Sequence, residues 1–200
     1  MNAVLSRRAF GSTLLAGIAL ATLPAPARAL DLASARALID RAIAEVNIVI
    51  NAGKPEAAMF KDFEGIFVKY ADVDAIARSA LGPAARQASP GQMKAFTAAY
   101  QGYIGRKYGR RFREFIGGRI EVVDAKPLKS YFEVISVAHL KGEAPFDLRW
   151  HVSNKSGRDL FFNIIIEGVN MLASEREEIG AMLKKRNGDL EALIADLKTA

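Results

Sequence analysis

Hydrophobic residues follow a helical spacing from residue 31 to about residue 116. Between residues 32 and 50 they recur every three or four positions, and Gly53-Lys54-Pro55 ends the run. A second helix is predicted over residues 56–70, where phenylalanines share one side. This part of the chain is therefore expected to be helical.

Two further helices have clear start signals. Asp72 can cap a short helix that runs to Leu81. Ser89-Pro90-Gly91-Gln92 combines a capping serine, proline at the first helical position and glutamine three residues after the serine. The helix that follows contains Gly102, Gly105 and Gly109 on one face. These glycines indicate either close approach of another chain segment or a kink.

After Gly117-Gly118 the pattern changes from helical spacing to alternation. Candidate strands cover residues 119–125, 131–140, 146–153 and 160–169. Short connections between them favour antiparallel hairpins. Ser174 is expected to cap a helix to about Lys185, and Asn187-Gly188-Asp189 separates it from a last helix. Helices, then a sheet, then helices predict an α+β fold.

The first 29 residues have the pattern of an export signal. Arg7 and Arg8 precede an apolar stretch, and Ala27-Arg28-Ala29 forms an A-x-A cleavage site. The apolar stretch is about ten residues long, whereas a helix needs roughly 20 to span a bilayer. Ser6-Arg7-Arg8-Ala9-Phe10 matches the core of a twin-arginine signal. We expect a twin-arginine signal peptide (residues 1–29), cleaved after Ala29, and a single domain over residues 30–200.

Composition excludes several kinds of site. The chain has no cysteine, which excludes disulfides, thiolate metal sites and cysteine nucleophiles. Without the three arginines of the signal segment, 25 basic and 22 acidic residues remain, a net charge of +3. An excess of this size does not by itself indicate a polyanionic partner. Since an exported protein also meets little nucleic acid, no nucleic-acid partner is expected.

Few residues have the spacing of catalytic or metal-binding groups. His139 and His151 lie on different predicted strands without a second ligand at a useful spacing, so no metal site is expected. The chain has no nucleophile elbow, phosphate-binding loop, dinucleotide fingerprint or zinc-protease motif. Glu167 lies among apolar neighbours, where a carboxylate can act as a general base. Alternation instead places it opposite Ile164 and Ile166, as an ordinary polar residue near the strand end.

The stretch GRKYGRRFREF, residues 105–115, combines basic and aromatic side chains. On a helix the aromatic residues fall on one side, as core or pocket wall: Tyr108, Phe112 and Phe115. Three arginines repeat that spacing on the opposite side: Arg106, Arg110 and Arg113. This basic face is either a solvated helix surface or a docking face for an acidic partner or anionic head groups.

Several short motifs, taken in order, resemble one protein family. They are Ala77-Arg78-Ser79-Ala80-Leu81-Gly82, Ser89-Pro90-Gly91-Gln92, Phe96 with Tyr100, Lys107-Tyr108, Arg149-Trp150-His151-Val152, Ile166-Glu167-Gly168-Val169-Asn170, Arg176 and Asn187-Gly188-Asp189-Leu190. Their order and spacing are similar to those of the MlaC (toluene-tolerance) family of periplasmic phospholipid-binding proteins, over nearly all of residues 33–198. The chain departs from that pattern at Ala85 and Asp159, where tryptophan is common, and at Asn170, where serine is usual.

The resemblance implies a fold related to the NTF2-like one. In it, a curved antiparallel sheet of about four strands is wrapped by N- and C-terminal helices around an apolar cavity for lipid tails. It also implies a periplasmic carrier, not an enzyme, that needs no cofactor and binds a phospholipid ligand. Such a carrier shuttles lipid between an outer-membrane lipoprotein complex and an inner-membrane ABC transporter complex, and so maintains outer-membrane lipid asymmetry.

Inward-facing periodicity gives candidate tail-contacting residues, each of which is alternatively ordinary core. They are Phe67, Phe96, Tyr100, Tyr103, Ile104, Phe132, Val134, Trp150, Val152 and Ile164. Three other functions stay open. One is a hopanoid-associated paralogue that binds another lipid. Another is a small cavity-bearing NTF2-like enzyme with Glu167 or Asp147 as base, which requires a carboxylate that points into the cavity. The third is an assembly or adaptor protein without a ligand, which predicts no cavity of ligand size.

Overall fold

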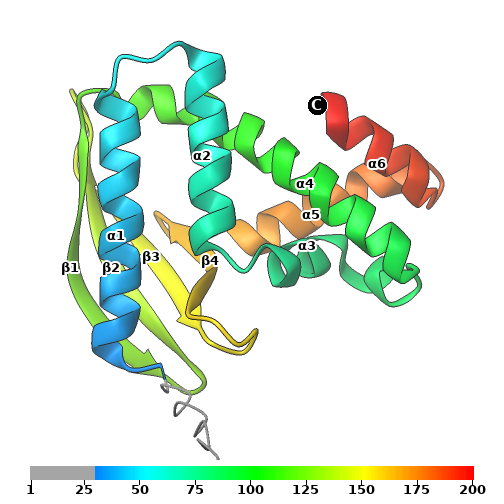
Figure 1. Ribbon diagram of the computed structural model, residues 1–200, viewed down its shortest axis with the longest axis horizontal. Helices are drawn as coiled ribbons and strands as arrows, with labels where there is room; N and C mark the ends of the chain where they lie inside the picture. Colours follow the sequence, from blue (N-terminus) through cyan, green and yellow to red (C-terminus); the bar gives the residue numbers. More distant parts are fainter. Residues whose placement is uncertain (1–29) are drawn as a thin grey trace, which may run out of the picture.

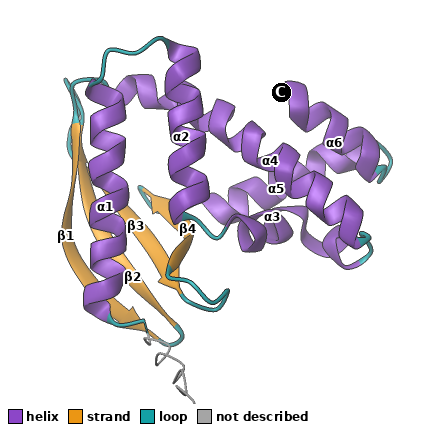
Figure 2. Ribbon diagram, viewed as in Figure 1, coloured by secondary structure: helices purple, strands orange, loops and turns teal. Residues whose placement is uncertain are grey.

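The computed structural model describes residues 30–200, apart from the side chains of Phe112 and Arg113, and Figures 1 and 2 show its arrangement. The α-helices of this part are α1 (Leu32–Asn51), α2 (Glu56–Tyr70), α3 (Val73–Leu81), α4 (Pro90–Arg111), α5 (Met171–Lys185) and α6 (Leu190–Thr199). The strands are β1 (Arg119–Leu128), β2 (Tyr131–His139), β3 (Phe146–Ser153), β4 (Leu160–Ile166) and β5 (Val169–Asn170). Short 3-10 turns follow α3 and α4, as η1 (Gly82–Arg86) and η2 (Phe112–Phe115).

The helix starts form where the local chemistry predicts them. The Asp72 carboxylate accepts a hydrogen bond from the Ala75 amide at 3.1 Å and so caps the N-terminus of α3. At the start of α4, the Ser89 hydroxyl accepts from the Gln92 amide, while the Gln92 side chain accepts from the Ser89 amide. This reciprocal pair is a capping box, and it confirms the predicted helix start.

The strands form one open antiparallel sheet in the order β1-β2-β3-β4-β5. The α+β prediction is therefore confirmed, with a short fifth strand added. The predicted last strand, residues 160–169, is wrong at its end. After Ile166 the chain turns through Glu167 and Gly168, which both have positive φ (49° and 82°), and returns as β5.

The start of α5 also differs from the prediction. The Asn170 side chain accepts from the Ala173 amide at 3.1 Å, so the helix begins at Met171. Ser174, the predicted cap, lies one turn inside the helix, where its hydroxyl donates to the Asn170 carbonyl. The turn at Glu167 brings Asn170 into the capping position, four residues before the predicted cap Ser174.

The helices cover one face of the sheet and extend beyond one of its edges (Figure 1). Helix α1 packs across β1, β2 and β3, and α2 lies beside it. Helix α4 packs on α2 and α6, while α3 packs on α5, beyond β4. No helix between residues 30 and 200 is both long and apolar enough to cross a membrane. The hydrophobic core therefore has a sheet as one wall and helices as the other.

Gly105 and Gly109 of α4 mark close contact with α2. A Cβ atom on Gly109 would lie 2.4 Å from Cδ1 of Phe60, and one on Gly105 would lie 3.1 Å from Cβ of Glu64. Real Cβ atoms essentially never come as close as the first of these distances. The structure thus supports close approach of another chain segment as the explanation for Gly105 and Gly109, whereas a Cβ on Gly102 would meet only the Arg106 side chain of the same helix, at 3.1 Å.

Candidate functional site

The helix-facing side of the sheet supplies the first wall of a buried apolar cluster. Val134 of β2 pairs with Trp150 of β3, and Trp150 pairs with Ile164 of β4. Phe132 and Val152 form the next pair on the same face of β2 and β3. Because side chains alternate across a strand, these five residues share the face that the helices cover.

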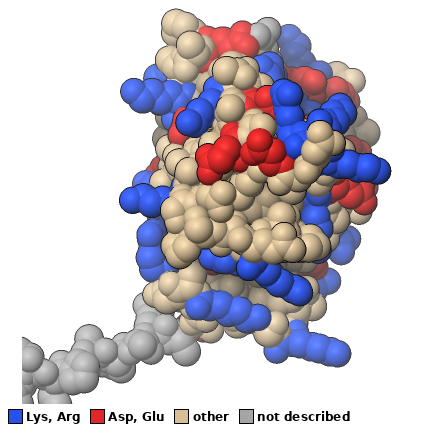
Figure 3. Space-filling view, turned by 90° about the vertical axis from the view of Figure 1, so that its right-hand side faces the viewer, with Lys and Arg blue, Asp and Glu red and all other residues tan. Residues whose placement is uncertain are grey.

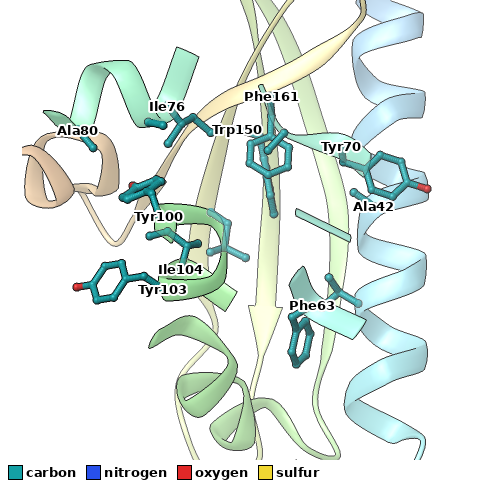
Figure 4. Packing of buried hydrophobic residues seen from close by; sticks show 14 of the residues in the cluster. Ala42, Phe63, Tyr70, Ile76, Ala80, Tyr100, Tyr103, Ile104, Trp150 and Phe161 are labelled. Atoms are coloured by element: carbon teal, nitrogen blue, oxygen red, sulfur yellow. The ribbon is translucent and has the colours of Figure 1, made fainter. Parts of the chain in front are cut away.

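Helix α4 supplies the opposite wall. The rings of Phe96 and Tyr100 stack with centroids 5.7 Å apart, and the ring of Tyr103 follows at 6.3 Å from Tyr100. Figure 4 shows Tyr100, Tyr103 and Ile104 on one side of the cluster, with Phe161 between them and the side chains from α1 and α2. The cluster is therefore continuous from α4 to α1.

All ten predicted tail-contacting residues lie in or against this one cluster. Seven are buried within it: Phe96, Tyr100, Tyr103, Ile104, Val134, Trp150 and Val152. The other three are partly buried and packed against it: Phe67, Phe132 and Ile164. Phe161 is not among the residues predicted to contact the lipid tails. Its ring centroid lies 5.3 Å from that of Trp150 and 6.4 Å from that of Phe67. A register shift opposite His151 and Val152 decides that Phe161 faces inward, and alternation alone does not reveal it.

Polar groups inside the cluster are few. The Trp150 Nε1–H donates to the Ser136 hydroxyl at 2.9 Å, and Ser136 is fully buried. The Tyr100 hydroxyl is buried and has no hydrogen-bond partner among the described residues. Burial, with the nearby Glu175 carboxylate, raises the pKa of Tyr100. Tyr100 therefore keeps its proton and remains a hydrogen-bond donor in an apolar surrounding.

A charged network borders the cluster between α4 and α5. Lys107 Nζ lies 2.7 Å from Glu175 Oε1, which also accepts from the Tyr108 hydroxyl at 2.6 Å. Lys107 pairs with Glu178 as well, and Glu178 accepts from the Tyr103 hydroxyl. Burial, reinforced by the carboxylates, raises the pKa of Tyr103 and of Tyr108. The network stabilises the contact of α4 with α5 at the edge of the cluster.

The predicted basic face of α4 is not one uniform surface. Arg106 Nη2 donates to the Leu197 carbonyl at 2.6 Å, and its Nε donates to the Ala200 carbonyl at 2.8 Å. Arg106 therefore satisfies carbonyls at the end of α6, so its guanidinium is engaged within the protein. Arg110 is exposed, and the Arg113 side chain lies outside the described part.

The two carboxylates considered as catalytic bases do not enter the cluster. Glu167 is exposed in the turn between β4 and β5, and the Asp147 side chain is 54% exposed. The enzyme alternative required a carboxylate that points into the cavity, and neither residue meets that requirement. Glu167 was expected within a strand; the turn at Gly168 moves it to the surface.

A buried polar row joins β2, β3 and β4. His151 Nε2 lies 3.3 Å from Glu133 Oε2, and His151 Nδ1 lies 3.4 Å from Asn163 Nδ2. Asn163 in turn accepts from the Leu172 amide in α5. Burial lowers the pKa of His151, so the neutral imidazole is favoured and donates through Nε2. Burial alone would raise the pKa of Glu133, but Lys126 at 3.0 Å and His151 hold it below its usual value.

The same row has no metal-binding arrangement. Among residues 30–200, no three His, Asp or Glu side chains are grouped so that they could hold a metal ion. His139 lies apart from His151 and contacts Glu121 at 2.9 Å. Each of the two histidines thus lies within hydrogen-bond distance of a glutamate carboxylate, His139 of Glu121 and His151 of Glu133.

Comparison with known proteins identifies a matching family and a solved structure with a similar fold. A family model described as "MlaC protein" matches residues 40–199. Among solved structures, the chain is similar to the phospholipid-binding protein from Ralstonia solanacearum, which was solved in complex with a phospholipid. The match has a TM-score of 0.68 at 19% sequence identity, and covers 82% of this chain and 98% of that chain. At this identity the likeness concerns the fold.

Proposed function

Because the chain belongs to the MlaC family, we propose that it is a carrier that binds a phospholipid by its acyl chains. One observation supports this most strongly. A continuous apolar cluster lies between the sheet and the helices, in a fold similar to that of a protein solved with a phospholipid. The tail contacts proposed are the ten residues of the cluster selected above, together with Phe161.

The energetics of such a ligand favour transfer through a docked partner over release into water. Two acyl chains contain on the order of 30 methylenes, and burying each contributes about 0.8 kcal/mol, or roughly 20–25 kcal/mol in total. Spontaneous release into water would therefore be very slow. Transfer would require a docked partner that offers a continuous apolar path for the tails.

The head group needs little from the protein, because it can stay in water. Within the cluster, the Tyr100 hydroxyl is a buried donor without a partner among the described residues. A buried donor left unpaired costs about 1–3 kcal/mol. In the loaded protein this hydroxyl would donate to an ester carbonyl oxygen of the lipid, where the tails join the glycerol.

The cellular role follows from the family and the first 29 residues. The signal-like segment, which lies outside the described residues, would direct export to the periplasm. There the mature domain, residues 30–200, would exchange phospholipid with an outer-membrane lipoprotein complex and an inner-membrane ABC transporter complex. That exchange would maintain the lipid asymmetry of the outer membrane. Among the described side chains of the predicted docking face, Arg110, near the end of α4, is exposed.

Native mass spectrometry tests the proposal. Residues 30–200 are purified from the periplasm without detergent, and their mass is compared before and after denaturation. The expected result is one added phospholipid mass per chain, which disappears on denaturation and is identified by lipid extraction. A purely apo mass, unchanged after incubation with phospholipid vesicles, would contradict the proposal.

A further inference from the structure

A second site lies on the outer side of α3, opposite the side of that helix that packs into the apolar cluster. Ile76 and Ala80 of α3 pack into the cluster, while the opposite side of the helix borders a surface pocket of about 480 Å³. Three arginines line this pocket: Arg78 of α3, Arg86 of η1 and Arg176 of α5. None of its eight lining residues, all within the described part of the chain, is acidic.

Arg176 is held in a fixed position. Its Nε donates to the Ser79 carbonyl at 2.8 Å, and its Nη2 donates to the Ser79 hydroxyl at 2.9 Å. A guanidinium has five N–H donors in a rigid plane. Capping the end of α3 thus uses two of the five donors, and the remaining donors are available beside the pocket.

The other two arginines have no counter-charge. Arg78 and Arg86 are exposed, and neither forms an ion pair with any residue between 30 and 200. Asp74 lies one turn before Arg78 but does not pair with it in the structure. Like charges around a shared hollow repel each other, and a bound anion removes that repulsion.

A second pocket of similar size provides a comparison. It has a volume of about 500 Å³ and is also lined by three basic residues, Arg41, Lys69 and Arg158. Glu45 and Asp159 line it too, and Lys69 pairs with Glu45. This pocket therefore contains its own anions, whereas the pocket at α3 contains none among its lining residues.

We propose that the arginine pocket formed by Arg78, Arg86 and Arg176 binds a phosphate group. Guanidinium groups match phosphate because two parallel N–H donors meet two phosphate oxygens. The phosphate belongs either to the head group of a lipid at a membrane surface or to a free phosphate ion. In Figure 3, which shows the side of the molecule that carries α6, the charged residues in the lower part of the surface are mainly Lys and Arg, and most carboxylates lie above them.

The test compares two double variants of the mature protein, residues 30–200. Arg78→Gln with Arg86→Gln removes two charges from the arginine pocket. Arg41→Gln with Arg158→Gln removes two charges from the comparison pocket and serves as the matched control. Inorganic phosphate is titrated at constant ionic strength and followed by the NMR signals of arginine Nε–H groups. In a second arm, flotation measures binding to vesicles of phosphatidylcholine with or without phosphatidylglycerol.

The wild type should bind phosphate saturably, with the signal of Arg176 shifted. Affinity should fall about tenfold or more in the first double variant, and by less than about twofold in the control. Selective flotation with phosphatidylglycerol vesicles, lost in the first variant only, would identify a lipid head group. Saturable phosphate binding without such flotation would identify the free ion.

Other outcomes would overturn the proposal. These are the absence of both phosphate and vesicle binding in the wild type, and equal losses in the two double variants. Binding of an acidic protein but of neither phosphate probe would overturn it as well. If the double variant does not fold, Arg86→Gln alone is used, because Arg86 is exposed on η1. In that variant, unchanged phosphate binding and unchanged flotation would both count against the site.

Discussion

A methyl group at Gly109 would occupy space that Phe60 already fills. The added Cβ would lie 2.4 Å from Phe60 Cδ1 and 3.0 Å from its Cγ, so the ring must move or α2 must separate from α4. Within a helix, glycine to alanine alone stabilises by about 1 kcal/mol. Overpacking of a fitted contact costs about 1–3 kcal/mol. We expect Gly109→Ala to lower the free energy of unfolding by up to about 2 kcal/mol.

Gly180 in α5 provides the matched control, because a Cβ there would have no neighbouring atom within 4 Å. Gly180→Ala should raise the free energy of unfolding by up to about 1 kcal/mol. Urea unfolding of the mature protein, with linear extrapolation to water, measures both variants. In a Phe60→Ala background, Gly109→Ala should no longer destabilise, since the obstructing ring is gone. Equal stabilisation by both alanines in the wild-type background would refute the packing argument.

Two other predictions concern His151 and Arg110. Because burial lowers the pKa of His151, the unfolded chain takes up this proton first as the pH falls. The free energy of unfolding should therefore decrease as the pH drops from about 7 towards 5, and His151→Asn should reduce that slope in urea titrations. A wild-type stability that is constant over this range would contradict the assignment. Arg110→Glu should change stability by less than about 0.5 kcal/mol and retain bound lipid, yet slow lipid transfer to the purified transporter. Lys185→Glu, an exposed charge reversal on α5, is its control, and equal transfer rates in the two variants would exclude Arg110 from docking.

Local sequence signals predicted the elements whose boundaries depend on neighbouring residues. The Ser89–Gln92 capping box and the Asp72 cap need only a few positions, so α4 and α3 begin where expected. The end of β4 was not predictable in the same way. The apolar run Ile164–Ile166 is compatible with a longer strand, and only pairing with β5 shows that the chain turns at Glu167.

The sequence did not predict features that depend on contacts between distant segments of the chain. Alternation selected Val134 and Trp150 for the apolar cluster, but the register shift in β4 was needed to place Phe161. The arginine pocket joins Arg78 to Arg176, almost a hundred residues apart, because α3 packs on α5. No sequence periodicity connects such positions. The spacing of Arg106 predicts an outer position on α4, but its guanidinium donates to the Leu197 carbonyl near the end of α6.

We propose that the acyl chains of the bound lipid lie in the apolar cluster between the sheet and α4. Photocrosslinking with a phospholipid that carries a diazirine near the end of one acyl chain tests it most directly. In the loaded mature protein, peptide mapping should find the label on cluster residues such as Val134, Trp150 or Tyr100. The exposed residue Ile48 should remain unlabelled. Labels confined to exposed residues, with none on the cluster, would contradict this position of the acyl chains.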